Sequence, residues 1–173
     1  MTTAPLTVRP ATDDDLGTLV SLYDGAARWM LAQGITQWTP GGRDERHFRR
    51  LLRSASAEVW LAHDGPGNAL GAYELWWSDE QAWGVQPPVA GYVHRLMTRR
   101  GAPAGTGRGL LADAERRIAA AGRSLSRLDC VETNPRLRTY YEKAGYTVVG
   151  KLPDKRAADG SLYAVLLLER PLG

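Results

Sequence analysis

The sequence predicts a single domain of the α+β class, built on a mixed β-sheet. The chain has 173 residues, of which 43% are hydrophobic and 24% charged, a composition that suits one globular domain. No internal repeat or low-complexity tract divides it. Segments with strand and helix periodicity follow in the order strand, two helices, three strands, helix, strand, helix, two strands. We therefore expect one continuous domain over residues 1–173.

The N-terminal elements are a short strand and a long helix. Residues Leu6–Pro10 predict the strand. Thr12, with Asp15 three residues on, fits an acidic variant of the capping box and marks the start of the helix. Gly34 is the expected end of the helix. Its apolar positions recur at helical spacing: Leu16, Leu19, Val20, Tyr23, Ala27 and Met30.

A second helix and a hairpin follow. The helix is expected from about Asp44 to Leu52, and the hairpin strands are Glu58–Ala62 and Ala69–Trp77. The loop 64–68 between them is rich in turn-forming residues, which indicates an antiparallel pair. Five arginines recur along the predicted second helix, and a solvated face is their simplest interpretation. They are Arg43, Arg46, Arg49, Arg50 and Arg53.

The second half begins with a strand at Val89–Thr98, followed by a glycine-rich segment over residues 99–109. Helical spacing resumes with Leu110 and ends at Gly122. The sequence Asn134-Pro135 opens another helix that runs through Ala144. The remaining predicted strands are Leu125–Val131, Tyr146–Lys151 and Ser161–Glu169.

Charge and cysteine content exclude several classes of protein. A formal net charge of +3 is only mildly basic and does not by itself indicate nucleic-acid binding. The single cysteine, Cys130, cannot form an internal disulfide, and one thiol is too few for a zinc-ribbon site. No apolar run approaches the roughly 20 residues that cross a bilayer. With no secretory signal pattern at the start, we expect a cytoplasmic protein without a membrane segment or metal.

The glycine-rich segment is the strongest local motif. Gly105 and Gly107 stand between a strand and a helix, where free backbone amides and the helix dipole favour an anion such as phosphate. No Lys-Ser/Thr pair follows, so the segment is not a P-loop. Asp129, about 20 residues on, leaves a dinucleotide site as a weaker alternative.

The second motif spans Asn134 through Tyr146. A helix start explains Asn134 fully, and core packing would explain Tyr140 and Tyr141, but neither explains the whole run at this place. Taken together in this order, the two segments resemble the GCN5-related N-acetyltransferase family, over about residues 5 to 170. The first, Leu96-x-Thr98 and the following residues to Leu111, is similar to the acetyl-CoA pyrophosphate loop of that family. One departure is Ala102, where Gln or Arg is usual.

This resemblance implies a fold and a co-substrate. The fold is a mostly antiparallel sheet of six to seven strands, in an α/β/α arrangement with about four helices, whose two central parallel strands splay apart. The co-substrate is acetyl-CoA, with its pantetheine arm between the splayed strands and its pyrophosphate at the helix start. The implied binding residues are Leu96, Met97, Thr98, Arg99, Arg100, Ala104, Gly105, Thr106, Gly107, Arg108 and Asn134.

The implied chemistry is direct transfer of the acyl group to an amine. Tyr141 is the expected general acid for the leaving thiolate, and a backbone amide near Leu96 to Thr98 is the expected oxyanion donor. His94 shares strand parity with Leu96 and Thr98 and has a suitable reference pKa, which favours it as the base, although an isolated strand histidine is more often structural. Glu74 and Glu132 are rival bases.

The acceptor is the least defined part of the prediction. Four residues are candidates for contact with it: Trp38, Glu74, Trp76 and Glu132. An aromatic wall favours a flat or cationic amine. A buried structural role suits Cys130 better than that of a nucleophile.

The favoured function is an N-acetyltransferase for the primary amine of a small molecule, such as an antibiotic, amino acid or amine metabolite, while a protein amine stays open as acceptor. One alternative is a non-catalytic acyl-CoA-binding sensor or interaction module. Another is an acyltransferase with an aminoacyl-tRNA donor, the one setting in which a nucleic-acid partner is expected. A homodimer is also compatible with the resemblance.

Overall fold

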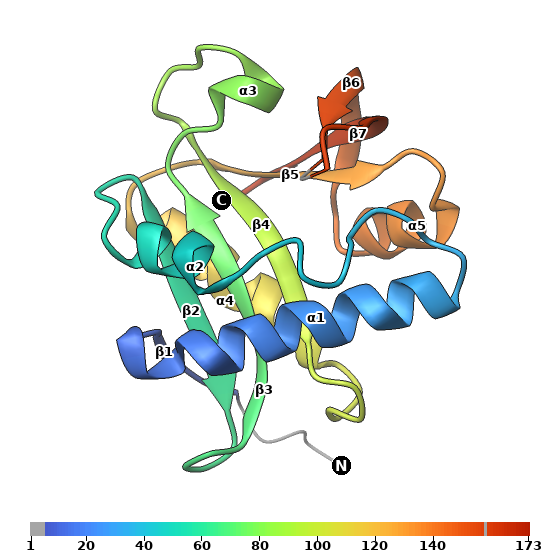
Figure 1. The fold of residues 1–173 in the computed structure, drawn as a ribbon. Helices are drawn as coiled ribbons and strands as arrows, with labels where there is room; N and C mark the ends of the chain where they lie inside the picture. The colour runs from blue at the N-terminus through green and yellow to red at the C-terminus, as the bar shows by residue number, and fades with distance from the viewer. Residues whose placement is uncertain (1–5, 158) are drawn as a thin grey trace.

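The computed structural model describes residues 6–157 and 159–173, which fold into a central sheet between two layers of helices (Figure 1). The elements, in chain order, are β1 (Thr7–Pro10), the 3-10 helix η1 (Asp13–Asp15), α1 (Leu16–Ala32), α2 (Glu45–Leu52), β2 (Ala57–His63), β3 (Ala69–Trp76), α3 (Glu80–Trp83), β4 (Ala90–Thr98), α4 (Thr106–Ala120), β5 (Leu125–Val131), α5 (Pro135–Lys143), β6 (Thr147–Arg156) and β7 (Leu162–Pro171).

The sheet has seven strands in the order β1-β2-β3-β4-β5-β7-β6. Every neighbouring pair is antiparallel except β4 and β5. The parallel pairing runs only from Ala90 opposite Leu125 to Tyr92 opposite Arg127, after which the two strands diverge (Figure 1). The predicted α+β class and the predicted splay of the central strands are confirmed. Beyond Tyr92 the β5 side of β4 therefore has no ladder partner.

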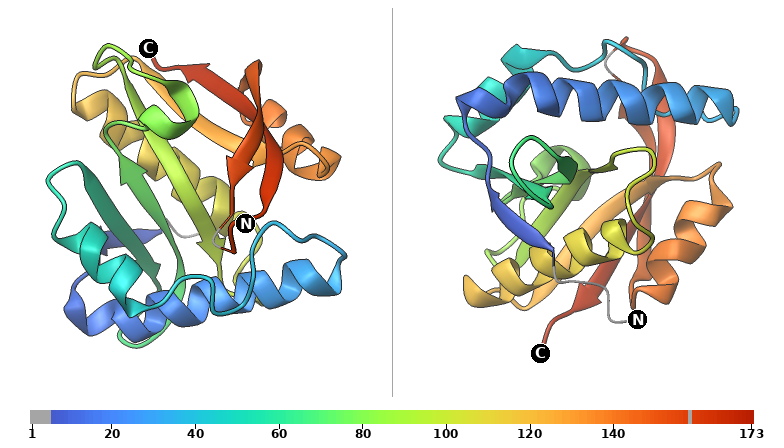
Figure 2. Two further views of the ribbon diagram at one scale, coloured as in Figure 1. Left: turned by 45° about the horizontal axis from the view of Figure 1, so that its top comes forward. Right: turned by 90° about the horizontal axis from the view of Figure 1, so that it is seen from below.

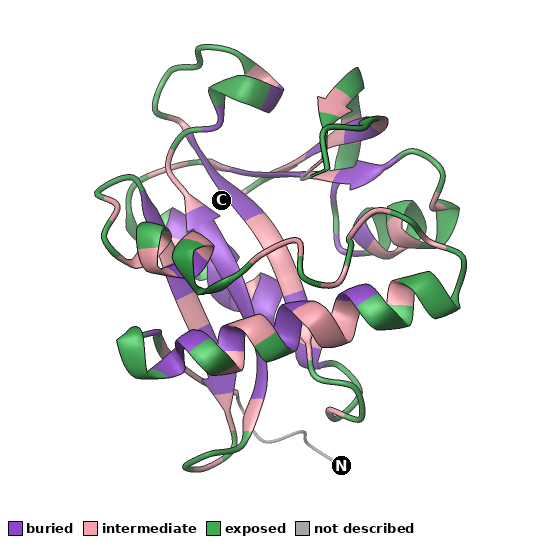
Figure 3. Ribbon diagram, viewed as in Figure 1, coloured by how far each residue is buried: buried purple, intermediate pink, exposed green. Residues whose placement is uncertain are grey.

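Helices cover both faces of the sheet (Figure 2). Helices α1 and α2 pack on one face around Leu19, Phe48 and Met97, and α4 and α5 pack on the other around Leu111 and Tyr73. Along the helices, buried residues alternate with exposed ones, and the buried residues lie on the sides toward the sheet (Figure 3). This is the amphipathic arrangement that the 3.6-residue spacing in the sequence predicts.

Close packing of α4 on β4 depends on a glycine. A Cβ atom at Gly91 would lie 2.4 Å from Ile118 Cγ1 and 2.8 Å from its Cδ1. The helix therefore lies closer to the strand than any side chain at this position would allow. This contact fixes the position of α4 on the sheet, including the start of the helix at Thr106.

The structure differs from the predicted elements at several ends. A turn of 3-10 helix precedes α1, in which the Asp15 carboxylate accepts from the Thr12 amide at 2.8 Å, as the capping pattern predicts. Helix α4 begins at Thr106, earlier than its apolar spacing indicates, because Gly105 caps it and the first turn carries glycines instead of apolar residues. The one-turn helix α3 was not predicted, and β6 extends to Arg156. None of the described helices is both long and apolar enough to cross a membrane.

Candidate active site

A bulge in β4 shapes the site. His94 pairs with Glu74, and Met97 pairs with Ala72. Between these two pairs β4 therefore has one residue more than β3. Arg95 lies in the bulge at φ 45, and it is the one non-glycine residue of the described ranges with positive φ. Such an extra residue reverses the alternation of side chains. The expectation that His94 shares a face with Leu96 and Thr98 is therefore wrong, because regular alternation ends at Arg95.

Arg95 is held in this strained conformation by a buried acid. Its guanidinium donates to Glu74 Oε1 at 2.7 Å, and His47 Nε2 lies 2.9 Å from Glu74 Oε2. Trp76 Nε1 also donates to Oε1, at 3.1 Å. Burial alone would raise the pKa of Glu74, but the charges of Arg95 and His47 outweigh burial and lower it to about 2. Glu74 is thus a fully buried, ionised anchor of the bulge.

A groove of about 460 Å³ runs between the end of β4, the start of α4 and one side of α5. Most of the predicted co-substrate residues line it: Leu96, Met97, Thr98, Arg99, Arg100, Gly105, Thr106, Gly107 and Arg108. Ala104 and Asn134 do not line it. We call this space the groove.

The start of α4 presents free backbone amides to the groove. Gly105 caps the helix with φ 89, in the left-handed region that favours glycine. The amide and the hydroxyl of Thr106 both donate to Pro103 O, at 3.2 and 2.7 Å. The amides of Gly107 and Arg108 then belong to the helix start that has no intrahelical partner. A Cβ at Gly107 would lie 2.9 Å from Tyr140 Oη, so glycine keeps this cradle open. The residues present fit an anion such as a pyrophosphate.

Arginines surround this cradle. Arg99 Nε donates to Ala69 O at 3.0 Å, and the Arg100 guanidinium lies 4.5 Å from the Trp29 ring centroid. Together with Arg108 they give the groove a cationic rim that favours phosphate groups. Ala102, the departure from the family pattern, packs against the core on the α4 side. Its methyl side chain adds no charge to the rim.

Asn134 has a structural partner. Its Oδ1 accepts from the Leu137 amide at 3.2 Å and so caps α5, the role that a helix start predicts. Its contact with a pantetheine arm stays a prediction.

A second cavity, of about 190 Å³, lies beside the groove. We call it the inner cavity. Trp38 and Trp76 line it, as do His94 and the residues introduced below. The groove and the inner cavity share four lining residues: Met30, Leu96, Leu137 and Tyr141. A ligand in each space would therefore meet the other at Tyr141 and Leu96.

Tyr141 stands at this junction and is 8% exposed. Burial raises the pKa of its phenol above the ordinary value of 10.0, so the hydroxyl stays protonated at neutral pH and is available as a donor. Cys130 lies in the core on the α4 side, fully buried, and burial raises the pKa of its thiol to about 11. Such a thiol is a poor nucleophile, as expected from the sequence.

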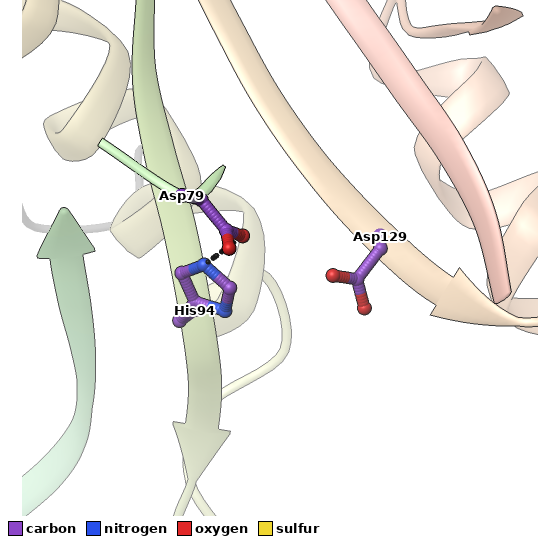
Figure 4. Close-up of side chains that lie close together, drawn as sticks. All are labelled: Asp79, His94 and Asp129. Atoms are coloured by element: carbon purple, nitrogen blue, oxygen red, sulfur yellow. Dashed lines mark ion pairs between the residues drawn. The ribbon is translucent and has the colours of Figure 1, made fainter. Parts of the chain in front are cut away.

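His94 is part of a cluster with two carboxylates (Figure 4). His94 Nε2 lies 2.9 Å from Asp79 Oδ2, and Asp129 completes a group whose ligand atoms all lie within 4.8 Å of one another. Lys155 Nζ donates to Asp129 at 2.7 Å. Burial opposes ionisation of Asp79, but His94 outweighs it and lowers the pKa of Asp79. His94 therefore faces the inner cavity with a carboxylate behind it, an arrangement typical of a general base.

The predicted acceptor residues divide into two groups. Trp38 stacks on Tyr23 with ring centroids 5.1 Å apart, and Trp76 lies 4.0 Å from the His94 ring, so both form walls of the inner cavity. Glu74 is buried behind the bulge. Glu132 is exposed, pairs with Lys151 at 2.6 Å and lines neither space.

Sequence reasoning missed Asp79 and Arg43. Asp79 caps α3, a helix too short for periodicity to reveal. The interpretation of the five arginines as one solvated face is wrong for Arg43, which precedes α2 and lines the inner cavity. The adjacent glycines at 41 and 42 were the available indication that the chain turns there. Arg49, in contrast, pairs with Glu45 on the surface of α2, as expected.

Comparison with known proteins agrees with this geometry. No family model matches the chain. An uncharacterized N-acetyltransferase of Bacillus subtilis, YesJ, is 28% identical over 148 residues, which is 82% of this chain and 81% of the relative. A GNAT-family acetyltransferase structure from Listeria monocytogenes matches with a TM-score of 0.76 at 24% identity, covering 96% of this chain and 95% of that one.

A third likeness is to a spermidine N-acetyltransferase from Vibrio cholerae, whose structure was determined with CoA and spermine. Its TM-score is 0.72 at 15% identity, with 98% of this chain and 96% of that chain covered, and it supports the fold alone. In sequence this chain is similar to an N-acetyltransferase, and its fold, with the splayed sheet and the capped helix start, is similar to that of GCN5-related N-acetyltransferase structures.

Proposed function

We propose that the protein transfers the acetyl group of acetyl-CoA directly to the primary amine of a small molecule. The observation that carries this proposal is the junction of the groove with the inner cavity at Tyr141 and Leu96. Direct transfer requires the acyl donor and the amine to meet in one place, and here two spaces share four lining residues, Tyr141 and Leu96 among them.

The groove supports acetyl-CoA as the donor. The amides of Gly107 and Arg108, with Arg99 and Arg100 on the rim, suit its pyrophosphate. The unpaired edge of β4 beyond Tyr92 suits the amide-bearing pantetheine arm, which needs backbone partners. Acetyl-CoA supplies the activated acyl group as a thioester.

Three protein groups would carry the transfer. The His94 ring accepts a proton from the amine, which then forms the new C–N bond. A backbone amide of β4 near Leu96 donates to the oxyanion. As the C–S bond breaks, the Tyr141 hydroxyl donates its proton to the leaving sulfur, and the second proton that the nitrogen loses as the amide forms returns to Tyr141 through solvent. Asp79 acts as a positioning residue, because it pairs with His94 at 2.9 Å and does not line the groove.

The test is release of CoA thiol in the presence of a panel of primary amines, with wild type and Tyr141→Phe. The variant is expected to lower kcat by about 100-fold or more, the usual contribution of a general acid, while acetyl-CoA affinity stays within about threefold. Tyr92→Phe is the matched control, because the Tyr92 hydroxyl accepts from Arg127 and Tyr92 lines neither space.

Retention of kcat in Tyr141→Phe within about threefold would contradict the role of Tyr141. Tight acetyl-CoA binding without thiol release on any amine would favour an acyl-CoA sensor. Absence of acetyl-CoA binding, with salt-dependent binding of RNA, would favour an aminoacyl-tRNA donor instead.

A further inference from the structure

Buried polar atoms without partners gather in one place in this protein. Among the described residues, Gln37 Oε1 and Arg43 Nε are buried without a hydrogen-bond partner, and Asp79 Oδ2 and His94 Nε2 have no partner except each other, 2.9 Å apart. All four residues line the inner cavity. Because proteins satisfy nearly all buried polar groups, this concentration points to a ligand that completes them.

Arg43 is the unusual member of this set. Its Nη1 donates to Gly42 O at 2.8 Å, but no ion pair joins it to a carboxylate of the described residues. The other half-buried cations of the inner cavity are paired, Arg95 with Glu74 and Lys155 with Asp129. A half-buried guanidinium without a counter-ion is costly, and a structure retains it most readily where a ligand supplies the anion.

The acids near Arg43 are already engaged. Glu74 is the carboxylate that most favours the charged form of Arg43, yet both of its oxygens hold Arg95, Trp76 and His47. Burial and the neighbouring charge of Arg95 lower the pKa of Arg43. An added negative charge beside Arg43 would therefore be favourable, and no free carboxylate of the described residues nearby supplies it.

The loop before α2 holds Arg43 in place. The Gly41 amide donates to Asp24 Oδ1 at 2.8 Å, which ties the loop to α1. A Cβ at Gly42 would lie 2.9 Å from Tyr23 Oη, so the chain passes closer to α1 than another residue would allow. Arg43 is thus presented to the inner cavity by a fixed backbone, and little further ordering is needed to bind a ligand.

Groups of the opposite kind lie on another wall of the inner cavity. Asp79 and His94 come from the β3–α3 connection and from β4, whereas Arg43 comes from the α1–α2 connection. Asp79 and His94 are paired with each other through Oδ2 and Nε2, and this carboxylate–imidazole pair on the cavity wall suits an amine that donates hydrogen bonds. The inner cavity thus offers an acceptor side for an amine and a donor side for an anion.

We propose that the acceptor is an aminocarboxylate, such as a free amino acid, whose carboxylate binds Arg43 while its amine lies beside His94 and Asp79. This inference rests on the proposed function and specifies its substrate class. An amine without an acidic group would leave Arg43 unpaired. A polyamine of matching length would bring a second cation toward it, an unfavourable like-charge contact.

The test compares aminocarboxylates with the amines that remain after loss of the carboxylate. The pairs are L-leucine and isoamylamine, L-phenylalanine and phenethylamine, L-tryptophan and tryptamine, and 4-aminobutyrate and n-propylamine. Each is assayed for CoA release with wild type, Arg43→Gln and Arg43→Lys. The matched control is Arg50→Gln, because Arg50 is exposed on α2 and lines neither space.

In wild type, at least one aminocarboxylate is expected to exceed its counterpart in kcat/KM by about tenfold or more. Arg43→Gln is expected to abolish that preference, mainly through a rise in KM of about 30-fold, with acetyl-CoA affinity and the melting temperature unchanged. Arg43→Lys should restore part of it, since lysine keeps the charge but not the bidentate geometry. A preference that Arg43→Gln leaves intact, or turnover confined to the amines without a carboxylate, would overturn the inference.

A binding measurement separates failure of the inference from failure of the proposed function. The same ligands are titrated by calorimetry into the protein in the presence of CoA, which requires no turnover. Binding of an aminocarboxylate that is lost in Arg43→Gln and kept in Arg50→Gln supports the inference even where no acetyl transfer occurs. Absence of binding by every aminocarboxylate contradicts it even where acetyl transfer to other amines is found.

Discussion

At the scale of single residues, His94 combines three features that a purely structural histidine does not need. Its ring faces the inner cavity, packs on Trp76 and has Asp79 2.9 Å from Nε2. A histidine that only filled the core would not border a cavity, whereas His94 lines the inner cavity while its Nε2 is paired with Asp79. We therefore propose His94 as the base.

Replacement of His94 by Gln is expected to lower kcat/KM by about 100-fold on an alkylamine, because an alkylamine must lose a proton before it attacks. The loss should be smaller on methoxyamine, a weakly basic acceptor that is already neutral at pH 7. The measurement is CoA release with both acceptors, with His63→Gln as the control, since His63 lies in β2 away from both spaces. Equal losses on the two acceptors would contradict the role.

Residues differ in how far the sequence could reveal their roles. Tyr141 and Gly107 belong to contiguous motifs, so local order sufficed to place them at the junction and at the helix start. Arg43 and Asp79 act through contacts with segments distant in the chain, and neither has a local pattern that distinguishes it from a surface charge. Glu74 was recognised as a candidate, but its burial depends on Arg95 and His47, which pattern alone does not bring together.

At the scale of elements, the contact of α4 with β4 fixes the groove. Gly91→Ala would bring a Cβ to 2.4 Å from Ile118 Cγ1, and this overpacking is expected to lower the free energy of unfolding by about 1–3 kcal/mol. Gly25→Ala is an opposite control, because Gly25 lies within α1 and a Cβ there meets nothing within 4 Å. It should stabilise the protein by about 1 kcal/mol.

Urea unfolding of the two variants measures both effects. A Gly91→Ala protein as stable as wild type would show that α4 can move away from β4 at little cost. In that case α4 would not be a rigid support for the anion site.

Elements with strong periodicity were predictable, whereas the β4 bulge was not. The apolar spacing in α1 and α4 and the strand patterns gave the order of elements, and the burial of one helix face followed from it. The bulge at Arg95 depends on pairing between two strands and on the Glu74 contact, so no property of residues 90–98 alone specifies it.

At the scale of the whole molecule, Glu74 links stability to pH. Its pKa is about 2 in the folded protein and near the ordinary 4.5 when unfolded, so folding favours the ionised carboxylate. This contribution to the free energy of unfolding is complete above about pH 4.5 and is lost as the pH falls toward 2.

Urea midpoints measured from pH 7 to pH 3 are expected to fall more steeply for wild type than for Glu74→Gln in the acid part of this range. The comparison is between slopes, because the variant is also less stable at neutral pH once Arg95 loses its partner. Parallel slopes would show that Glu74 has no depressed pKa in the fold.

The overall architecture followed from the sequence because the family motifs have a fixed place relative to the splayed strands. The resemblance predicted a mostly antiparallel sheet with splayed central parallel strands, and the described residues have both. It also placed the pyrophosphate at the helix start, beside which the groove lies. The inner cavity was less predictable, since its walls come from α1, β3, β4, β5 and β6 and their connections, which only the complete fold brings together.

The most direct test of the account is calorimetric titration of acetyl-CoA into wild type, Gly107→Val and Ala120→Val. Ala120 is exposed at the far end of α4 and controls for the lower helix propensity of valine. We predict binding to wild type and Ala120→Val, and affinity at least about tenfold weaker for Gly107→Val, because a side chain there fills the cradle beside Tyr140. Absence of binding to wild type, or equal affinity in Gly107→Val, would contradict it.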